Sequence, residues 1–223
     1  MIEFKEVTKQ YSTGNIVLDN VSFAIQPGEF VVLTGPSGAG KTTIARLMIK
    51  DVEPSSGQIY IEGEDLAKLK SKHIHTLRKK VAVIFQDYKI IPDKTVTENI
   101  VLALQIINFP SDKIIERVNH LLDLVGIPDK YNLFPVQLSG GELQRAAIAR
   151  AIAVEPMVLF ADEPTGNLDP QTGLDIMNLL KKINAANTTL IVATHNHDFI
   201  DLSDRHFHLD KGKMSSDKKT KKK

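Results

Sequence analysis

The chain has 223 residues, of which 42% are hydrophobic, and it contains no cysteine. This length and composition suit one compact domain with a substantial core, and they exclude both a disulfide framework and a thiolate metal site. The formal net charge is +1, but residues 211–223 hold seven lysines and one aspartate, a charge of +6, which leaves −5 for the rest of the chain. A mildly acidic body argues against a nucleic-acid groove, so we expect no nucleic-acid partner.

The first ten residues are charged and lack the apolar run of a signal peptide, and no window approaches the ~18 apolar residues of a membrane span. We therefore expect a cytoplasmic protein with no span of its own. The lysine-rich tail, residues 211–223, is expected to be disordered. It is either a solvated end or a segment attracted to an anionic membrane surface.

Two kinds of strand are expected along the chain. Residues 1–11, 15–28 and 57–66 are short, partly alternating β segments, which predicts an antiparallel layer. Residues 29–35 form a buried strand pattern that runs into a glycine turn, and residues 41–50 follow as a helix. Residues 80–87, 156–164 and 188–196 are near-continuous apolar runs that end in polar residues. Such runs predict a mostly parallel sheet covered on both faces, with functional groups at the strands' carboxyl ends.

Between these strands, residues 95–153 show helical apolar spacing. In the stretch 111–127, Ser111 is the expected N-cap and Gly126 the expected stop. One apolar face is predicted from Ile114, Ile115, Val118, Leu121, Leu122 and Val125. We therefore expect a single α/β domain with its core at about 1–94 and 154–210, a helical subdomain inserted at about 95–153, and the tail at 211–223.

The segment GPSGAGKTT, residues 35–43, has the spacing of a phosphate-binding loop between a strand and a helix. Glycines let the backbone turn tightly, so that successive N–H groups and the helix N-terminus face phosphate oxygens. Lys41 is expected to reach the β- and γ-phosphates, and the Thr42 hydroxyl to ligate Mg²⁺. The expected nucleotide contacts here are Gly35, Pro36, Ser37, Gly38, Ala39, Gly40, Lys41, Thr42 and Thr43.

A second element, VLFADE, is an apolar strand that ends in two acids. Asp162, beside the phosphate loop, is expected to hold the Mg²⁺ hydration shell, and Glu163 to polarise an attacking water. These features allow a kinase, a GTPase or an ATPase. The chain has no Asn-Lys-x-Asp motif of the kind that reads guanine, which disfavours a GTPase.

The segment LSGGE, residues 138–142, opens another helix with a second set of free N–H groups. One phosphate tail does not need two such sites in one chain. The simplest explanation is a head-to-tail homodimer with ATP between the phosphate loop of one chain and Ser139, Gly140, Gly141 and Glu142 of the other. A plain helix terminus is the alternative reading of the two glycines.

Together, GPSGAGKT, LSGGE, VLFADEPTGNLD and ATH resemble an ABC-type ATPase over almost the whole chain. The resemblance implies the P-loop NTPase fold with an antiparallel β layer and an inserted helical subdomain, Mg-dependent ATP hydrolysis and a nucleotide-sandwich dimer. It also implies roles for four further residues. Tyr11 would stack on adenine, Gln86 would sense Mg²⁺ and the water, Asp169 would touch the opposite subunit, and His195 would contact the γ-phosphate. His73, His75 and His197 match no family position and are expected at the surface.

The stretch DYKIIPDKTVTENI is where members of this family meet a membrane partner. The resemblance thus makes Tyr88, Ile90, Ile91 and Pro92 the expected contacts, although a buried turn of the helical subdomain explains any one of them equally well. FQDYKIIPDKTVTENI, ADEPTGNLDPQTGLDIMNLLKKIN and VATHN are similar to the FtsE subfamily. That subfamily works with the membrane protein FtsX in bacterial division and cell-wall hydrolase activation.

Three alternatives stay open from the sequence. Much of the pattern, including TGNLD, is shared with the LolD and MacB ATPases of lipoprotein and efflux transport. A soluble ABC ATPase acting on DNA or the ribosome is disfavoured by the single phosphate loop and the lack of a long heptad run. A small-molecule phosphotransferase leaves LSGGE and His195 unexplained.

Overall fold

A computed structural model describes residues 1–220 and contains two sheets. The smaller sheet is antiparallel and has the strand order β2-β1-β4-β5, with β1 at Ile2–Gln10, β2 at Ile16–Ile25, β4 at Ser56–Ile61 and β5 at Glu64–Asp65. One face of β1 is buried through Ile2, Phe4 and Val7, while its other residues are at least partly exposed. The predicted antiparallel β layer is thereby confirmed.

The larger sheet has the strand order β10-β9-β3-β8-β7-β6. Its strands are β3 (Phe30–Thr34), β6 (Val81–Ile84), β7 (Val158–Asp162), β8 (Thr189–Thr194), β9 (Arg205–Asp210) and β10 (Lys213–Lys219). The five neighbouring strands β9, β3, β8, β7 and β6 pair in parallel, and β10 pairs with β9 antiparallel. Every residue of β3, β7 and β8 is buried, as expected of strands covered on both faces.

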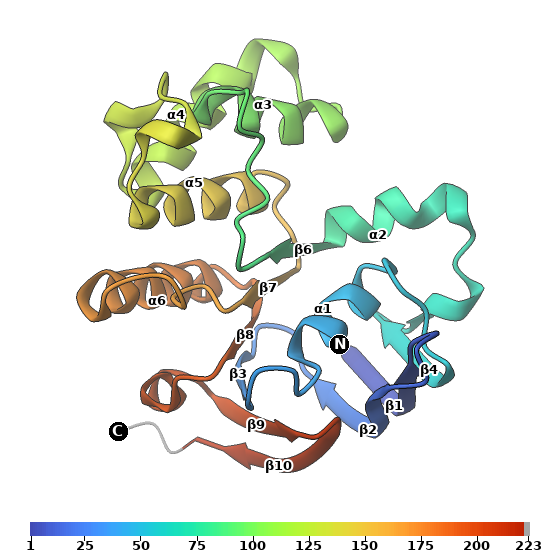
Figure 1. The fold of residues 1–223 in the computed structure, drawn as a ribbon. Helices are drawn as coiled ribbons and strands as arrows, with labels where there is room; N and C mark the ends of the chain where they lie inside the picture. Colours follow the sequence, from blue (N-terminus) through green and yellow to red (C-terminus); the bar gives the residue numbers. More distant parts are fainter. Residues whose placement is uncertain (221–223) are drawn as a thin grey trace.

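Alternate side chains of β3 feed two apolar cores. Val31 and Leu33 join the core that contains α1 (Lys41–Met48) and the antiparallel sheet. Phe30 and Val32 point the other way, into the core formed with α5 (Gly140–Ile152) and α6 (Pro170–Ala185). In Figure 1, α1 lies in the lower part of the molecule, and α6 lies directly below α5. A short helix, α2 (Ile74–Lys80), leads into β6.

The helical unit contains α3 (Val96–Ile106), α4 (Ile114–Val125) and α5, which lie together in Figure 1. A capping box between Thr95 and Glu98 starts α3, and Gly126, in the left-handed conformation at φ 76°, ends α4 as predicted. The Ser111 prediction is wrong, because Ser111 begins a 3₁₀ turn and Lys113 occupies the N-cap of α4. The prediction that Ile115 belongs to the buried face is also wrong. Ile115 is 60% exposed, because it lies about 100° around the helix from Ile114.

The remaining 3₁₀ turns are η1 (Leu66–Lys68), η2 (Ser71–His73), η3 (Ser111–Lys113), η4 (Pro128–Lys130), η5 (Pro135–Gln137) and η6 (His197–Leu202). They connect the regular elements, and η1 and η6 each contribute a buried side chain, Leu66 and Phe199. None of the helices within residues 1–220 is long and apolar enough to cross a membrane.

The prediction of a disordered tail is wrong for residues 213–219, which form β10. Arg205 explains part of the difference, because its Nε and Nη2 donate to the two carboxylate oxygens of Asp217 at 2.9 and 2.6 Å. Lys213 also pairs with Asp19 at 3.1 Å, which ties β10 to the antiparallel sheet. The last part of the predicted tail, residues 221–223, lies outside the described residues.

Candidate active site

The phosphate loop connects the buried end of β3 to the start of α1. Gly40 is the N-cap of α1 and has φ 111°, a conformation that favours glycine. A Cβ at Gly40 would lie 2.7 Å from Leu18 Cδ2, and a Cβ at Gly35 would collide with the carbonyl oxygen of Leu209. Close packing against β2 and β9 therefore favours glycine at both positions.

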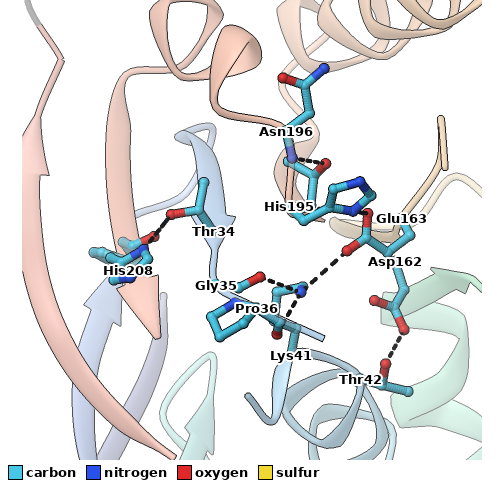
Figure 2. A network of polar contacts seen from close by, with 12 residues as sticks. Thr34, Gly35, Pro36, Lys41, Thr42, Asp162, Glu163, His195, Asn196 and His208 are labelled. Atoms are coloured by element: carbon cyan, nitrogen blue, oxygen red, sulfur yellow. Dashed lines mark hydrogen bonds and ion pairs between the residues drawn. The ribbon is translucent and has the colours of Figure 1, made fainter. Parts of the chain in front are cut away.

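Lys41 folds back over its own loop. Its Nζ donates to the carbonyl oxygens of Gly35 at 2.8 Å and Pro36 at 3.3 Å, and it pairs with Glu163 Oε1 at 3.2 Å (Figure 2). Only 6% of the Lys41 side chain is exposed. A nearly buried ammonium group in this position is a strong local attractor for anionic oxygens, and Glu163 supplies one.

Asp162 ends β7 directly beside the start of α1. The Thr42 hydroxyl donates to Asp162 Oδ2 at 2.5 Å, while Oδ1 is buried and has no hydrogen-bond partner among the described residues. Burial raises the pKa of Asp162, and the nearby Glu163 adds to this, while the Thr42 bond and Lys41 oppose it. A buried carboxylate oxygen without a partner, next to a hydroxyl, fits the oxygen ligands that Mg²⁺ prefers.

Glu163 lies between Lys41 and His195. Its Oε2 is 2.9 Å from His195 Nδ1, and the His195 backbone N–H donates to the same oxygen at 3.4 Å. Glu163 itself has φ 48°, an unusual conformation for a non-glycine residue. Figure 2 shows the chain of contacts from His195 through Glu163 to Lys41. The carboxylate is thereby fixed at the end of the parallel sheet.

Lys41, Thr42, Asp162 and Glu163 line a cavity of about 320 Å³. The structure brings together in it much of the predicted phosphate, metal and catalytic set: Ser37, Gly38, Gly40, Lys41, Thr42, Thr43, Gln86, Asp162 and Glu163, together with Val17. A second hollow, of about 820 Å³, shares Thr42, Gln86 and Asp162 with it. Gln86 therefore stands at the junction between the two spaces.

The predicted signature residues do not line this cavity. Ser139 caps α5 and forms a closed capping box with Glu142: the Ser139 backbone N–H and hydroxyl donate to Glu142 Oε2 at 2.9 and 2.8 Å. These bonds, together with Lys130 at 3.3 Å, lower the pKa of Glu142. Gly140 and Gly141 face residues 167–172 of the same chain, and a Cβ at Gly141 would lie 2.7 Å from Thr172 Cγ2.

The other predicted site residues outside this cavity lining are Gly35, Pro36, Ala39, His195, Asp169 and Tyr11, of which the last two belong to other parts of the chain. Asp169 caps α6 by accepting the Thr172 backbone N–H at 3.0 Å. Tyr11 is half-buried after β1, with Lys9 Nζ 5.1 Å from its ring centroid. Within one chain, neither residue is joined to the phosphate loop.

The predicted partner-contact stretch is anchored by hydrogen bonds with Asn99 and Arg150. Asn99, which is buried, bonds to both the N–H and the carbonyl of Ile91, and Arg150 donates to the carbonyls of Tyr88 at 3.1 Å and Lys89 at 2.7 Å. Tyr88, Ile90 and Ile91 are half-buried and Pro92 is exposed. Sequence reasoning missed these two anchors, since a buried Asn or Arg has no distinctive pattern.

Sequence reasoning also missed a polar cluster behind the phosphate loop. Thr34, the last residue of β3, has its hydroxyl 2.7 Å from His206 Nε2 and 2.8 Å from His208 Nδ1. The only signal in the sequence is the pair of histidines two residues apart on a strand, which places both on one face.

Comparison with known proteins bears on the whole chain. Residues 18–166 match the family described as ABC transporter. The cell division ATP-binding protein FtsE of Streptococcus pneumoniae serotype 2 (strain D39) is 47% identical over 218 residues, 97% of this chain and 95% of that protein. FtsE of Bacillus subtilis strain 168 is 48% identical over 90% of this chain and 88% of its own length, and FtsE of Escherichia coli K12 is 43% identical over 93% and 97%.

Solved structures agree. The ATP-binding cassette MJ0796, in a dimeric post-hydrolysis state bound to ADP and Pi, superposes with a TM-score of 0.91 at 34% identity, covering 99% of both chains. CbiO1 from Clostridium perfringens, part of the ABC transporter complex CbiONQ, gives 0.89 at 30% identity, covering 98% of this chain and 88% of its own. The predicted fold class is confirmed.

Proposed function

Because the chain belongs to the ABC transporter ATP-binding family, and within it to the FtsE group, we propose that it is the ATP-hydrolysing subunit of a bacterial division complex. In this complex it pairs with an FtsX-like membrane protein and passes an ATP-driven conformational change to cell-wall hydrolases. The single observation that carries the catalytic part is the placement of Glu163, which lines the phosphate-loop cavity and contacts both Lys41 and His195.

ATP is the substrate of this site. The loop from Gly35 to Thr43 offers its N–H groups and the N-terminus of α1 to the phosphates, and Lys41 adds a charge. Lys41 is already paired with Glu163 at 3.2 Å. The arriving phosphates would therefore replace Glu163 as the counter-ion of Lys41, which frees one carboxylate oxygen for water. The binding of substrate and the preparation of the base are coupled in this way.

The metal role is assigned to Thr42, Asp162 and Gln86. The unpartnered Oδ1 of Asp162 and the Thr42 hydroxyl support this assignment, and both line the cavity with Gln86. Bound Mg²⁺ would neutralise charge that develops on the phosphates. The protein's own part is to hold the Asp162 carboxylate in place, and the Thr42 bond favours its ionised form against the effect of burial.

Hydrolysis then needs Glu163 to accept a proton as water oxygen attacks the γ-phosphorus and the bond to the bridging oxygen of ADP breaks. His195 is 2.9 Å from Glu163 Oε2 and holds that carboxylate in place. In our proposal His195 also contacts the γ-phosphate, and Gln86 positions the water.

The assignments of the signature residues and of Asp169 require a second copy of the chain, whereas that of Tyr11 does not. Ser139, Gly140, Gly141 and Glu142 would close over the phosphates bound by the partner copy, and Asp169 would meet the opposite active site. Tyr11 would stack on adenine. The exposure of Ser139 supports this arrangement, as does the dimeric state named for MJ0796. The division into a core at 1–94 and 154–210 and a helical subdomain at 95–153 belongs to the same proposal.

We place the protein on the inner face of the cell membrane through its partner, with Tyr88, Ile90, Ile91 and Pro92 as contacts. An alternative is a transporter subunit of the LolD or MacB type. One observation favours it, because the similar cassette MJ0796 is described as a bacterial ABC transporter cassette, at 35% identity.

A capture experiment separates these readings. Tagged Glu163→Gln protein is incubated with native membranes and Mg-ATP, and the co-purified integral protein is identified. Recovery of a protein with few spans and a large extracellular loop supports the division role, whereas a lipoprotein or efflux permease moves the function to transport. Recovery of ribosomes or DNA without a permease would refute both.

A matched pair of variants tests the contact surface in the same experiment. Ile90→Asp should abolish recovery of the membrane protein, because it places a charge in the proposed contact. Ile115→Asp alters a similarly apolar but more exposed residue on α4 and should not. Equal recovery with both variants would remove residues 88–92 from the interface.

A further inference from the structure

Thr34 joins two histidines to the start of the phosphate loop. It is fully buried, its hydroxyl lies 2.7 Å from His206 Nε2 and 2.8 Å from His208 Nδ1, and the next residue is Gly35. The parallel register sets Thr34 beside His208 and Val32 beside His206, so all these side chains share one face of the sheet. Figure 2 shows Thr34 and His208 behind the loop, on the side away from Glu163.

Strand β9 also supports the loop directly. The carbonyl of Leu209 packs so closely against Gly35 that a Cβ there would collide with it, and Leu209 Cδ2 would be 3.4 Å from a Cβ at Gly40. Both ends of the phosphate loop therefore rest on the residue that follows His208. A shift of β9 would be transmitted to the loop whose N–H groups and Lys41 receive phosphate.

The proton arrangement at Thr34 is restricted. A hydroxyl donates one hydrogen bond and accepts two, so with both rings neutral one histidine donates to Oγ1 and the other accepts from it. Adding one proton makes both rings donors, and the hydroxyl must then turn to the carbonyl of Phe207, which is 3.5 Å away. The bond that replaces a 2.7–2.8 Å contact is long and weak.

We propose that His206 and His208, bonded to the Thr34 hydroxyl, are positioning residues for the phosphate loop, and that protonation of His206 in mildly acidic solution weakens nucleotide binding. The inference rests on the proposed nucleotide site and adds a proton-sensitive support to it. These two histidines act through Thr34 and Leu209 and touch no substrate.

The surroundings oppose protonation. Burial lowers the pKa of His206, and the neighbouring His208, His197 and Lys218 lower it further. The His197 and His208 ring centroids are 6.2 Å apart, and those of His206 and His208 are 6.4 Å apart. The titratable and charged groups on the elements around the pair are His197, Asp198 and Asp201 on η6, Lys213, Asp217, Lys218 and Lys219 on β10, Arg205 and Asp210 on β9, and Asp204 just before β9.

The sign of the effect follows from linkage. With its folded pKa below the ordinary value of about 6.5, His206 binds fewer protons in the folded than in the unfolded protein. Its stabilising contribution is present above about 6.5 and is lost as pH falls toward the folded pKa. A purely electrostatic influence would have the opposite sign, because imidazolium charge near the loop would attract phosphate.

The test measures the dissociation constant of a fluorescent, non-hydrolysable ATP analogue with Mg²⁺ at pH 8 and pH 6. The central variant is His206→Gln with His208→Asn, since the amide groups can replace Nε2 and Nδ1 without titrating. At pH 8 this variant should bind within about twofold of wild type. Between pH 8 and pH 6 the wild-type dissociation constant should rise by more than that of the variant, by a factor of up to about four, because a group with a pKa below about 6.5 is at most about three-quarters protonated at pH 6.

Two controls sharpen the test. His120→Gln removes an exposed histidine on α4 and should keep the wild-type pH dependence. Thr34→Val should weaken binding at pH 8, and Thr34→Ser should restore it. Thermal melts establish that each protein is folded at both pH values.

Equal pH dependence in wild type and the double variant, or tighter wild-type binding in acid, would overturn the inference while leaving the nucleotide site intact. Failure of the wild type to bind the analogue at pH 8 would instead overturn the proposed site itself.

Discussion

The two glycine-rich helix starts of this chain differ in how completely they are assembled. The phosphate loop at α1 is packed against β2 and β9, its lysine is nearly buried, and Asp162 and Glu163 face it across a cavity. The signature start of α5 is exposed at Ser139, and its cap is closed by Glu142 of the same chain. Similar sequences thus produce two different sites. The start of α1 is a preorganised half of a binding site, whereas the start of α5 is an exposed surface whose hydrogen bonds are made within its own chain.

The largest expected effect is on the preorganised side. Glu163→Gln should slow ATP hydrolysis by about 10²–10⁴-fold, because the amide cannot accept the proton of the attacking water. ATP binding should persist, since the amide no longer competes with phosphate for Lys41. Phosphate release and equilibrium ATP binding measure the two effects. Wild-type turnover by this variant would remove Glu163 from its role.

A change on the signature side should separate binding from hydrolysis. Ser139→Ala should leave ATP binding by a single chain within about twofold of wild type, because Ser139 does not line the cavity. Hydrolysis should fall by about 10²-fold, the usual loss for one donor to a developing negative charge. The N-cap loss, about 1 kcal/mol, is checked by thermal melting. If Ser139→Ala also weakened ATP binding by a single chain, the distinction between the two helix starts would be contradicted.

Asp162, the proposed metal ligand, should lower the stability of the protein when no metal is bound. Burial raises the pKa of Asp162, so ionisation of this group at neutral pH opposes folding. Asp162→Asn should therefore raise the melting temperature without Mg²⁺ by about 2–4 °C, the response of a chain this size to about 1 kcal/mol. It should also abolish Mg-dependent ATPase activity. A lower melting temperature would show that the carboxylate stabilises the site.

The smallest effect concerns the cap of α5. Hydrogen bonds from Ser139 lower the pKa of Glu142, so its stabilising contribution is present above the unfolded value of about 4.3 and is lost as pH falls through the folded value. Glu142→Gln should flatten this part of the stability-against-pH curve by at most about 1 kcal/mol. Denaturant melts between pH 3 and 7 would reveal it. An unchanged curve would mean that the capping box does not persist in solution.

Local patterns predicted the fold and the cavity well. Buried strands end in polar residues at Thr34, Asp162 and Thr194, and parallel pairing brings these ends together. Contacts that depend on tertiary placement were not predictable. Nothing in the sequence indicates that Lys41 pairs with Glu163, or that Thr34 bridges two histidines. The lysine-rich end was misjudged from composition, because Arg205 and the free edge of β9 order residues 213–219.

The central claim is that ATP joins the phosphate loop of one chain to the signature residues of another. The most direct test is the mass of the Glu163→Gln protein in solution, measured with and without Mg-ATP. This mass is compared with that of the same protein also carrying Ser139→Ala. The account predicts a mass near 24.7 kDa without nucleotide and about twice this value with Mg-ATP, with the dimer strongly reduced by the second substitution. A Glu163→Gln protein that is saturated with Mg-ATP yet stays at 24.7 kDa would contradict it.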